Sequence, residues 1–302
     1  MMPAPPPPTP VPAATKLYVL NHSTFGTGSA SNPSVTVYAA NASGNATPIA
    51  TLSGPHTTLA QSYYLAVDRA GTVYVSNAGN SNNGSVAVFP KGVLSGDIAP
   101  AFSLPTASAP TGLAVDSVGN LYVGLQDRIV VYGPGLSATS SPIHTIMGST
   151  AFVLSPYELF VGPKDELYEA QRKRIKTYAF GADGNATPIN NITGAATQLY
   201  SALGVAADST GKIFVTDVNT NAITTFAATD TGNMPPRSVI TNTMFSKPWG
   251  IWIDPADNAY LANEGTNAIY FFTSTALAAG VPTTTLSGAM TGLDNPTAVV
   301  VR

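Results

Sequence analysis

A stretch of thirteen residues recurs along the chain at a nearly fixed distance. Its clearest copy, TGLAVDSVGNLYV, begins at Thr111. Each further copy keeps an apolar run, a turn-forming centre and a second apolar run, and these copies begin at Tyr63, Tyr157, Leu203 and Trp249. The central residues are 46 to 48 positions apart, at Asp68, Asp116, Gly162, Asp208 and Asp254. A period of this size indicates a repeat architecture, in which each unit packs against its neighbours.

The repeated stretch has the composition of a β-hairpin. Leu113–Val115 and 121–123 are short apolar runs of the kind that form buried strands. Asp116 begins the segment between them, where its carboxylate can accept hydrogen bonds from backbone N–H groups. Gly119 can supply the positive φ that closes the turn. We therefore predict a tight hairpin in every copy, in which the repeated Asp caps the turn and is not part of a carboxylate ring.

Two further strand-like runs follow the hairpin in each unit, such as Ile129–Tyr132 and 143–147 in the clearest copy. Four short strands in about 46 residues are typical of a β-propeller blade. The chain starts in second-strand register at Lys16 and ends with a first strand at 296–302. We predict an all-β fold, a six-bladed β-propeller of four-stranded antiparallel blades. Its ring is expected to close by pairing of the C-terminal strand with the N-terminal three strands.

One segment carries a conflicting local signal. Residues 165–176, DELYEAQRKRIK, contain strong helix formers, whereas the repeat register places two strands there. We follow the register, because tertiary context overrides intrinsic propensity. Arg128 and the basic residues of 172–176 are interpreted as solvated charges, since acidic residues lie alongside them. No nucleic-acid partner is predicted, because such binding needs an extended basic surface.

The predicted domains are a Pro-rich disordered linker at 1–15 and one propeller at 16–302. We interpret the linker as a stalk, the alternative being a spacer without function. No apolar signal segment precedes it, and no run is long enough for a membrane span. Charged residues make up 10% of the chain against about 25% in an average domain, and there is no cysteine. We expect a monomer in an extracytoplasmic setting, either periplasmic, secreted or surface-anchored.

Two kinds of segment carry a resemblance to a known family. Pro110–Val123 and 247–261 resemble the repeats of NHL propellers, and the linkers GNATPIATLSG and GNATPINNITG resemble those of bacterial members. The resemblance covers nearly everything after Thr15. It implies the propeller fold but no single activity, because such propellers serve as sensors, binding platforms and enzymes.

The resemblance also implies that the first strand of each blade lines a central channel. The rim formed by the loops before these strands is called the top face below, and the opposite rim the bottom face. Similar gluconolactonase-like propellers bind a divalent cation through acidic or amide side chains at one place in each first strand. Here these places hold neither, but Tyr63, Thr111, Tyr157, Leu203, Trp249 and Thr297. We therefore predict no metal site, no cofactor and no catalytic residue.

Aromatic residues at the start of alternate first strands suggest a binding surface on the top face. One carboxylate is predicted to face the channel beside them, and a polar loop of the last unit completes the set. The predicted ligand-binding residues are Tyr63, Tyr157, Glu158, Trp249, Asn263 and Glu264. Flat aromatic faces with an acid suit a small ligand that has an apolar or sugar-like face and a polar or cationic group.

We predict a non-catalytic binding or sensor module whose top face takes a small molecule, a glycan or a protein. One alternative is a channel-mouth hydrolase or lyase, for which His22, His56 and Glu158 could supply proton transfer. Another is a structural scaffold for protein contacts, in which the rings only plug the channel. The loop 77–85 is a second possible location of the binding site.

Overall fold

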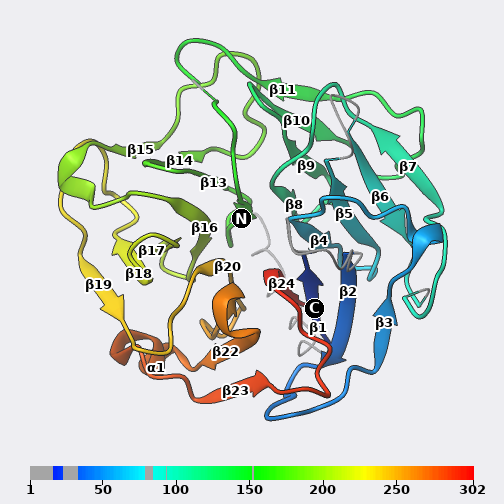
Figure 1. Cartoon of the computed structure of the whole chain (residues 1–302). Helices are drawn as coiled ribbons and strands as arrows, with labels where there is room; N and C mark the ends of the chain where they lie inside the picture. The colour runs from blue at the N-terminus through cyan, green and yellow to red at the C-terminus, as the bar shows by residue number, and fades with distance from the viewer. Residues whose placement is uncertain (1–15, 23–32, 79–83, 93, 152) are drawn as a thin grey trace, which may run out of the picture.

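The chain folds into six four-stranded antiparallel sheets arranged around a common centre, which confirms the predicted fold class (Figure 1). The computed structural model describes residues 16–22, 33–78, 84–92, 94–151 and 153–302. The predicted linker 1–15 and most of the loop 77–85 lie outside the described residues.

Each sheet is one blade, and its strands are given from the centre outwards. Blade 1 contains β24 (Pro296–Val301), β1 (Lys16–Asn21), β2 (Ser34–Ala39) and β3 (Ala50–Leu52). Blade 2 contains β4 (Leu65–Val67), β5 (Val73–Asn77), β6 (Ser85–Phe89) and β7 (Phe102–Pro105). Blade 3 contains β8 (Leu113–Val115), β9 (Leu121–Gly124), β10 (Ile129–Tyr132) and β11 (His144–Ile146).

The second half of the ring repeats this order. Blade 4 contains β12 (Leu159–Val161), β13 (Leu167–Gln171), β14 (Arg174–Tyr178) and β15 (Asn190–Thr193). Blade 5 contains β16 (Ala202–Ala207), β17 (Ile213–Asp217), β18 (Ala222–Phe226) and β19 (Ser238–Thr241). Blade 6 contains β20 (Pro248–Ile253), β21 (Ala259–Asn263), β22 (Ala268–Phe272) and β23 (Thr284–Ser287). Short 3-10 turns lie at Pro55–Thr57, Ala195–Thr197 and Glu264–Thr266.

The ring is closed by β24, which pairs antiparallel with β1 as predicted. Val299 lies opposite Val19 and Val301 lies opposite Leu17. Because blade 1 takes its inner strand from the C-terminal end of the chain, β1 has a partner on both sides. An unpaired β1 would expose a row of backbone N–H and C=O groups.

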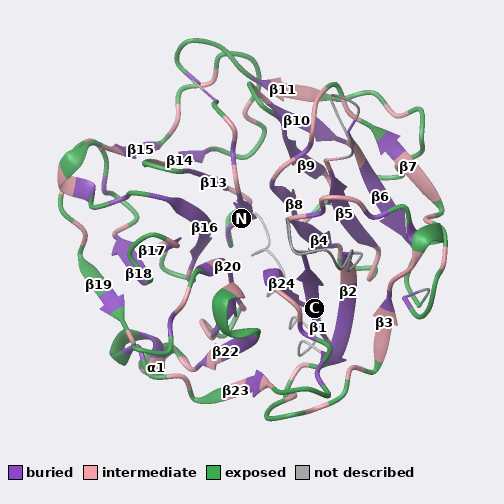
Figure 2. Cartoon of the chain, in the orientation of Figure 1, coloured by how far each residue is buried: buried purple, intermediate pink, exposed green. Residues whose placement is uncertain are grey.

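The middle strands are buried on both faces because each blade is covered by a blade on either side (Figure 2). Alternation along β5 shows the arrangement. Val73 and Val75 belong to the apolar cluster shared with blade 1, whereas Tyr74 belongs to the cluster shared with blade 3. A strand with two buried faces has to be apolar at nearly every position, which explains the short continuous runs in the sequence.

The hairpin turns are capped as predicted. Asp116 Oδ1 accepts hydrogen bonds from the backbone N atoms of Val118 (3.1 Å) and Asn120 (2.8 Å). Asp165, which replaces the turn glycine in the copy that begins at Tyr157, has φ 59°. Its carboxylate also accepts from Ser117 N (2.8 Å) of the preceding blade. The turn aspartates therefore hold their own hairpin, and Asp165 additionally joins two blades.

The outer linkers join neighbouring blades in the same way. Asn185 Oδ1, in the GNATP segment after β14, accepts from the backbone N atoms of Thr150 (2.7 Å) and Ala151 (3.1 Å) in the loop that leaves blade 3. Asn45 and Asn233 accept comparable bonds from Met290 N and Ala196 N. The Asn side chain repeated in these linkers therefore connects neighbouring blades by hydrogen bonds.

Most of residues 165–176 lie in β13 and β14, which confirms the two strands predicted from the repeat register and not the helix favoured by local propensity. The interpretation of every basic residue there as a solvated charge was wrong, because Lys176 is buried and donates to Ala151 O. Beside it, Glu169 accepts from Gln171 Nε2 (2.5 Å) and Tyr178 Oη (3.2 Å). Burial raises the pKa of Glu169 to about 7 and lowers the pKa of Lys176 to about 8.

One helix, α1 (Ser274–Ala279), was not predicted. Thr273 caps its start by accepting from Ala276 N (3.3 Å), and Gly280 ends it with φ 69°. It occupies the connection between β22 and β23, where other blades have a loop. No helix in the described part of the chain is long and apolar enough to cross a membrane.

Ring closure can be tested by removing residues 297–302. The truncated protein should aggregate or lose its cooperative thermal transition, because β1 becomes an open edge. Removing residues 1–15 is the matched control and should leave the transition unchanged. A truncated protein that remains monomeric by size-exclusion chromatography and melts at the parent temperature would contradict the closure.

Candidate functional site

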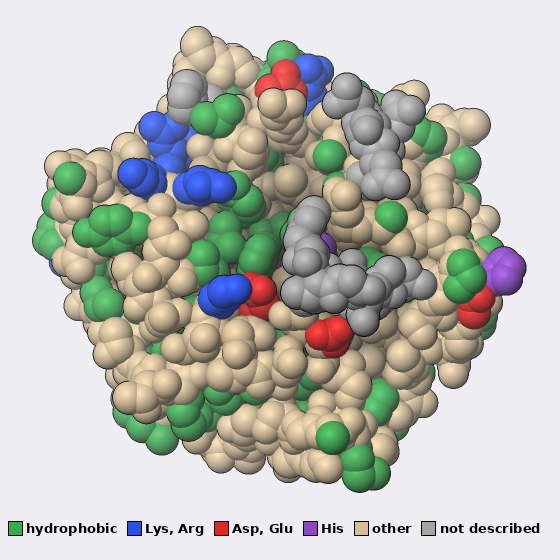
Figure 3. All heavy atoms as spheres, viewed as in Figure 1, with side chains coloured by type: hydrophobic (Ala, Val, Ile, Leu, Met, Phe, Trp, Pro, Cys, Tyr) green, Lys and Arg blue, Asp and Glu red, His purple; other side chains and the backbone are tan. Residues whose placement is uncertain are grey.

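The predicted aromatic residues lie at one end of the ring, because the inner strands all run in the same direction around the channel. Tyr63, Tyr157 and Trp249 stand at or just before the beginnings of β4, β12 and β20, and all three are partly exposed. This end is the top face, which Figure 3 views; apolar side chains and a few charged ones gather near its middle. We call this region the channel mouth.

Three rings from three blades form a row at the channel mouth. His22, directly after β1, stacks on Tyr63 with 4.2 Å between ring centroids and 24° between planes. Tyr63 and Trp249 are nearly parallel, at 6.1 Å and 16°. Trp249 is also fixed by its Nε1–H, which donates to Tyr64 Oη (3.2 Å). The row therefore presents flat faces whose orientation is set by packing and a hydrogen bond.

Tyr157 belongs to a different contact. Arg172, in the β13–β14 turn, donates from Nε to Tyr157 Oη (2.8 Å), and its guanidinium carbon lies 5.6 Å from the ring centroid. The sequence placed three equivalent aromatics on alternate blades. The structure joins Tyr63 with Trp249 and gives Tyr157 a cationic partner instead.

Glu158 is the acidic centre of the channel. It is 8% exposed, and Oε2 accepts from Val205 N (2.9 Å) on β16. Its carboxyl group also accepts from the backbone N of Ile251 on β20. The Glu158 side chain of blade 4 thus accepts a hydrogen bond from one inner-strand backbone N–H of blade 5 and from one of blade 6. Burial raises the pKa of Glu158 well above its ordinary value, and the two backbone N–H groups only partly oppose this.

Two glycines of the repeat make room for this carboxyl group. A Cβ atom added to Gly204 would lie 2.8 Å from Glu158 Oε2, and one added to Gly250 would lie 3.3 Å from Oε1. Gly204 and Gly250 occupy the same place in their blades as Glu158 does in blade 4. The copy in blade 4 therefore fills, with one long side chain, the space that the glycines of blades 5 and 6 leave open.

Apolar side chains close the channel beneath Glu158. Phe160, two residues further along β12, meets Trp252 of β20 edge to face at 5.4 Å. Trp252 packs against three of the apolar clusters between blades, as expected for a ring near the axis. Glu158 is therefore buried on the mouth side of this apolar contact.

Charged and polar groups surround the aromatic row. Glu264 and Lys247 form an ion pair at 3.5 Å. His22 Nδ1 lies 3.0 Å from Ser62 O, so Nδ1 carries the proton and Nε2 is the acceptor. Burial lowers the pKa of His22, although the Ser62 carbonyl and the charges of Glu264 and Asp294 oppose the shift. His22 is therefore a neutral imidazole at neutral pH.

Asn263 is fully buried, unlike the other predicted binding residues of its loop. Its Oδ1 accepts from Ser246 N (2.9 Å), and its Nδ2 donates to Met244 O (3.3 Å) and Thr266 Oγ1 (2.5 Å). These bonds shape the loop that carries Glu264. We place Asn263 behind the mouth, as a residue that positions Glu264.

The three-residue set of His22, His56 and Glu158 is not assembled. His56 Nδ1 pairs with Asp97 Oδ2 at 2.6 Å, and the His56 side chain is 75% exposed. Only His22 joins the mouth. In the described part of the chain, no group of three or more His, Asp or Glu side chains is placed to hold a metal ion.

The sequence assigned no individual role to Tyr64 or Arg172. It grouped His22 with His56, whereas His22 stacks on Tyr63 in the structure. Tyr64 Oη accepts from Trp249, and burial raises the pKa of Tyr64, followed by the charge of Glu158. The repeat register distinguishes Tyr64 from its neighbour Tyr63, because Tyr64 aligns with Glu158 and Tyr63 with Tyr157. The position of Arg172 in the turn after a second strand would have placed it on the top rim.

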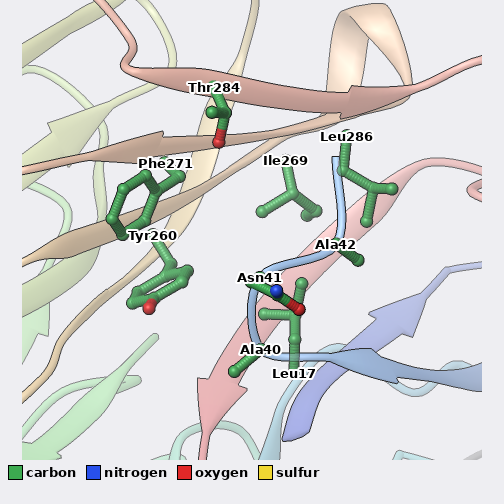
Figure 4. Close-up of a pocket in the computed structure, with 9 residues that line it drawn as sticks. All are labelled: Leu17, Ala40, Asn41, Ala42, Tyr260, Ile269, Phe271, Thr284 and Leu286. Carbon is green, nitrogen blue, oxygen red and sulfur yellow. The ribbon is translucent and has the colours of Figure 1, made fainter. Parts of the chain in front are cut away.

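Two cavities lie away from the mouth. One, of about 290 Å³, lies between blades 6 and 1, where the small Ala40 and Ala42 face Tyr260 and Phe271 (Figure 4). It is mostly apolar, and nothing in the structure shows what covers it. The second, of about 350 Å³, lies between blades 1 and 2 at the bottom face.

No family model and no curated protein matches the chain. Solved structures do match. A protein of unknown function from Bacteroides caccae aligns with TM-score 0.66 and 8% identity over 95% of this chain and 99% of that chain. A periplasmic gluconolactonase from Pseudomonas aeruginosa aligns with TM-score 0.62 and 16% identity over 96% and 86%.

A catalytically inactive virginiamycin B lyase from Staphylococcus aureus, solved with quinupristin, aligns with TM-score 0.52 and 15% identity. The alignment covers 87% of this chain and 83% of that chain. At these identities the likeness shows the fold alone. The class that fold and site define is a six-bladed β-propeller with a row of aromatic side chains at the channel mouth.

Replacing Glu158 by Gln tests the buried carboxyl group. Its folded-state pKa is above the ordinary value of 4.5, so stability from the protonated form is present below about pH 4.5 and is lost as pH rises through the folded pKa. The Gln variant should be less stable than the parent by about 1–3 kcal/mol at pH 4, because its NH2 group faces a backbone donor. This deficit should shrink as pH rises, because only the parent ionises.

The measurement is chemical denaturation of both proteins between pH 4 and 9. Glu264→Gln serves as the control, because it removes a mouth carboxylate that does not contact Val205 or Ile251. A deficit that is constant over this range would contradict a raised pKa at Glu158.

Proposed function

We propose that the protein is a binding or sensor module without catalysis of its own, and that the channel mouth takes a small ligand. The observation that carries the proposal is the row of His22, Tyr63 and Trp249. These rings are near-parallel and come from three blades, and Tyr63 and Trp249 are partly exposed. Rigid aromatic faces at the channel mouth suit the flat apolar face of a sugar or of an aromatic molecule.

The polar end of the ligand is proposed to meet the buried Glu158 or the Glu264–Lys247 pair at the rim. A protonated Glu158 donates a hydrogen bond and suits a hydroxyl or carbonyl group. An amine or quaternary ammonium would instead favour the ionised carboxylate, and Tyr63 and Trp249 could face the cation. Affinity for a cation should therefore rise with pH as Glu158 ionises, whereas affinity for a neutral sugar should not.

A second candidate is a hydrolase or lyase at the same mouth. It is favoured by His22, whose Nδ1–H is directed to Ser62 O and whose acceptor nitrogen Nε2 is that of a neutral base. Two of the solved structures with a similar fold are a gluconolactonase and a virginiamycin B lyase. A third candidate is a scaffold for protein contacts, in which the mouth rings serve packing only.

We also propose that the chain is an NHL-like propeller that acts as a monomer in an extracytoplasmic compartment. The stretch Pro110–Asp116 and its drifted copies support the NHL-like assignment, and the Pro-rich sequence of 1–15, interpreted as a stalk, supports the extracytoplasmic setting. The low content of charged residues is in keeping with a partner other than nucleic acid.

Ligand binding is tested by a thermal-shift screen of free sugars, aromatic amines and quaternary ammonium ions, followed by calorimetry. For a ligand so found, Trp249→Ala and Tyr63→Ala should each weaken binding by about 2 kcal/mol or more, because each removes an aromatic anchor. Phe180→Ala, on an exposed aromatic side chain at the bottom face, is the matched control and should leave affinity unchanged.

Two outcomes would contradict this site. In the first, both mouth variants fold and bind as tightly as the parent. In the second, Trp249→Ala costs about 3–5 kcal/mol of stability and no compound binds, as expected if the ring only fills space.

The enzymatic alternative is tested by metal analysis and a lactonase assay. The purified protein should contain no stoichiometric calcium or zinc, because no carboxylate or amide stands at the six places implied by the gluconolactonase resemblance. Stoichiometric metal together with lactone hydrolysis that a chelator abolishes would show that the protein is an enzyme. Hydrolysis without metal that His22→Gln abolishes would assign catalysis to His22.

A further inference from the structure

The cavity between blades 1 and 2 lies at the opposite end of the ring from the mouth. Tyr63 precedes β4, whereas Asp68 and Arg69, which line this cavity, follow it. Its volume of about 350 Å³ is at the lower end of the range for small-molecule sites. Four cationic side chains line it: Lys16, Arg69, Lys91 and Arg302.

This concentration of positive charge is unusual for the chain. Four of its 13 Lys and Arg residues line one cavity, although the net charge is −3. Every Asp and Glu of the sequence lies in the described part of the chain, and none forms an ion pair with these four residues. The cavity therefore collects cations that the protein itself does not neutralise by direct contact.

The one acidic side chain in the lining is engaged elsewhere. Asp68 Oδ1 accepts from Thr72 N (2.8 Å), and Oδ2 accepts from Tyr74 Oη (3.2 Å). Lys91 crosses the same turn, since a Cβ atom on Gly71 would lie 3.3 Å from Lys91 Cγ. Asp68 thus caps its hairpin, and the aliphatic part of Lys91 packs against Gly71 of the same turn.

Arg302 is held in place by two contacts. Its Nε donates to Val67 O (3.2 Å), and the guanidinium carbon lies 4.7 Å from the centroid of the Trp252 ring. Burial lowers the pKa of Arg302 to about 10; the charge of Arg69 acts in the same direction, and the charge of Asp68 opposes both. A partly buried guanidinium beside a second cation is costly unless an anion joins them.

We propose that this cavity binds a small oxyanion, a phosphate or sulfate group that is free or carried by a small molecule. A fixed guanidinium offers forked donors that match tetrahedral oxygens, and the ammonium groups of Lys16 and Lys91 add mobile charge. We call these four residues the bottom anion site. The proposal is independent of the mouth, because Phe160 and Trp252 separate the two ends.

The test is calorimetric titration of the full chain with inorganic phosphate, sulfate, glucose 6-phosphate and glucose at constant ionic strength in sodium chloride. The oxyanions should bind saturably at the bottom anion site, whereas any binding of glucose should take place at the mouth and should be the same in Arg69→Gln and Lys91→Gln as in the parent. Tighter binding of glucose 6-phosphate than of phosphate would assign the site to a phosphorylated small molecule, and equal binding to the free ion. Arg69→Gln and Lys91→Gln should each raise the Kd roughly tenfold or more, since each removes a charge-assisted contact.

Lys173→Gln is the matched control, because it removes an exposed cation from the top face. It should leave the Kd for phosphate and for sulfate unchanged. The proposal fails if none of the oxyanions binds saturably, or if chloride displaces them as expected for general screening. It also fails if both Gln variants at the site bind like the parent.

Discussion

The pairing of β24 with β1 is the interaction on which the rest of the structure depends. Each blade is covered on both faces only if the ring is complete, and the apolar runs of the middle strands are stable only under such cover. The hydrogen bonds between the outer linkers, such as that from Thr150 N to Asn185 Oδ1, then connect blades that are already in contact. They help to fix the angle between neighbours, whereas the strand pair decides whether the ring exists.

The fold was predictable because its information is repeated. A single copy such as 157–169 has lost its turn Asp and Gly, yet its register was recovered from the other four. The helix α1 was missed because it replaces a loop in one blade only and leaves the period unchanged. Lys176 was misplaced because a basic side chain on a middle strand gives no sign in the sequence of the carbonyl oxygen that it reaches.

The sequence predicted where the aromatic residues of the channel mouth lie, but not which of their rings contact one another. Equivalent positions on first strands put Tyr63, Tyr157 and Trp249 on one rim, as the repeat required. Which rings meet depends on side-chain direction and on loops of different blades, and neither is periodic. The carboxyl of Glu158 between two blades arises from the same break in symmetry, because one blade supplies a long side chain where two others have glycine. Departures from the repeat thus produce the contacts that the period alone does not predict.

The two ends of the described chain meet at one edge of blade 1. Lys16 N donates to Arg302 O at 2.8 Å, and Arg302 N donates to Lys16 O at 3.0 Å. Topologically the protein is a circle that has been cut between the first and second strands of one blade. A circular permutant that joins these ends and opens an exposed loop between two other blades would keep every strand pair. The ring therefore depends on the repeated strand pairs, and not on which blade contains the two ends of the described chain.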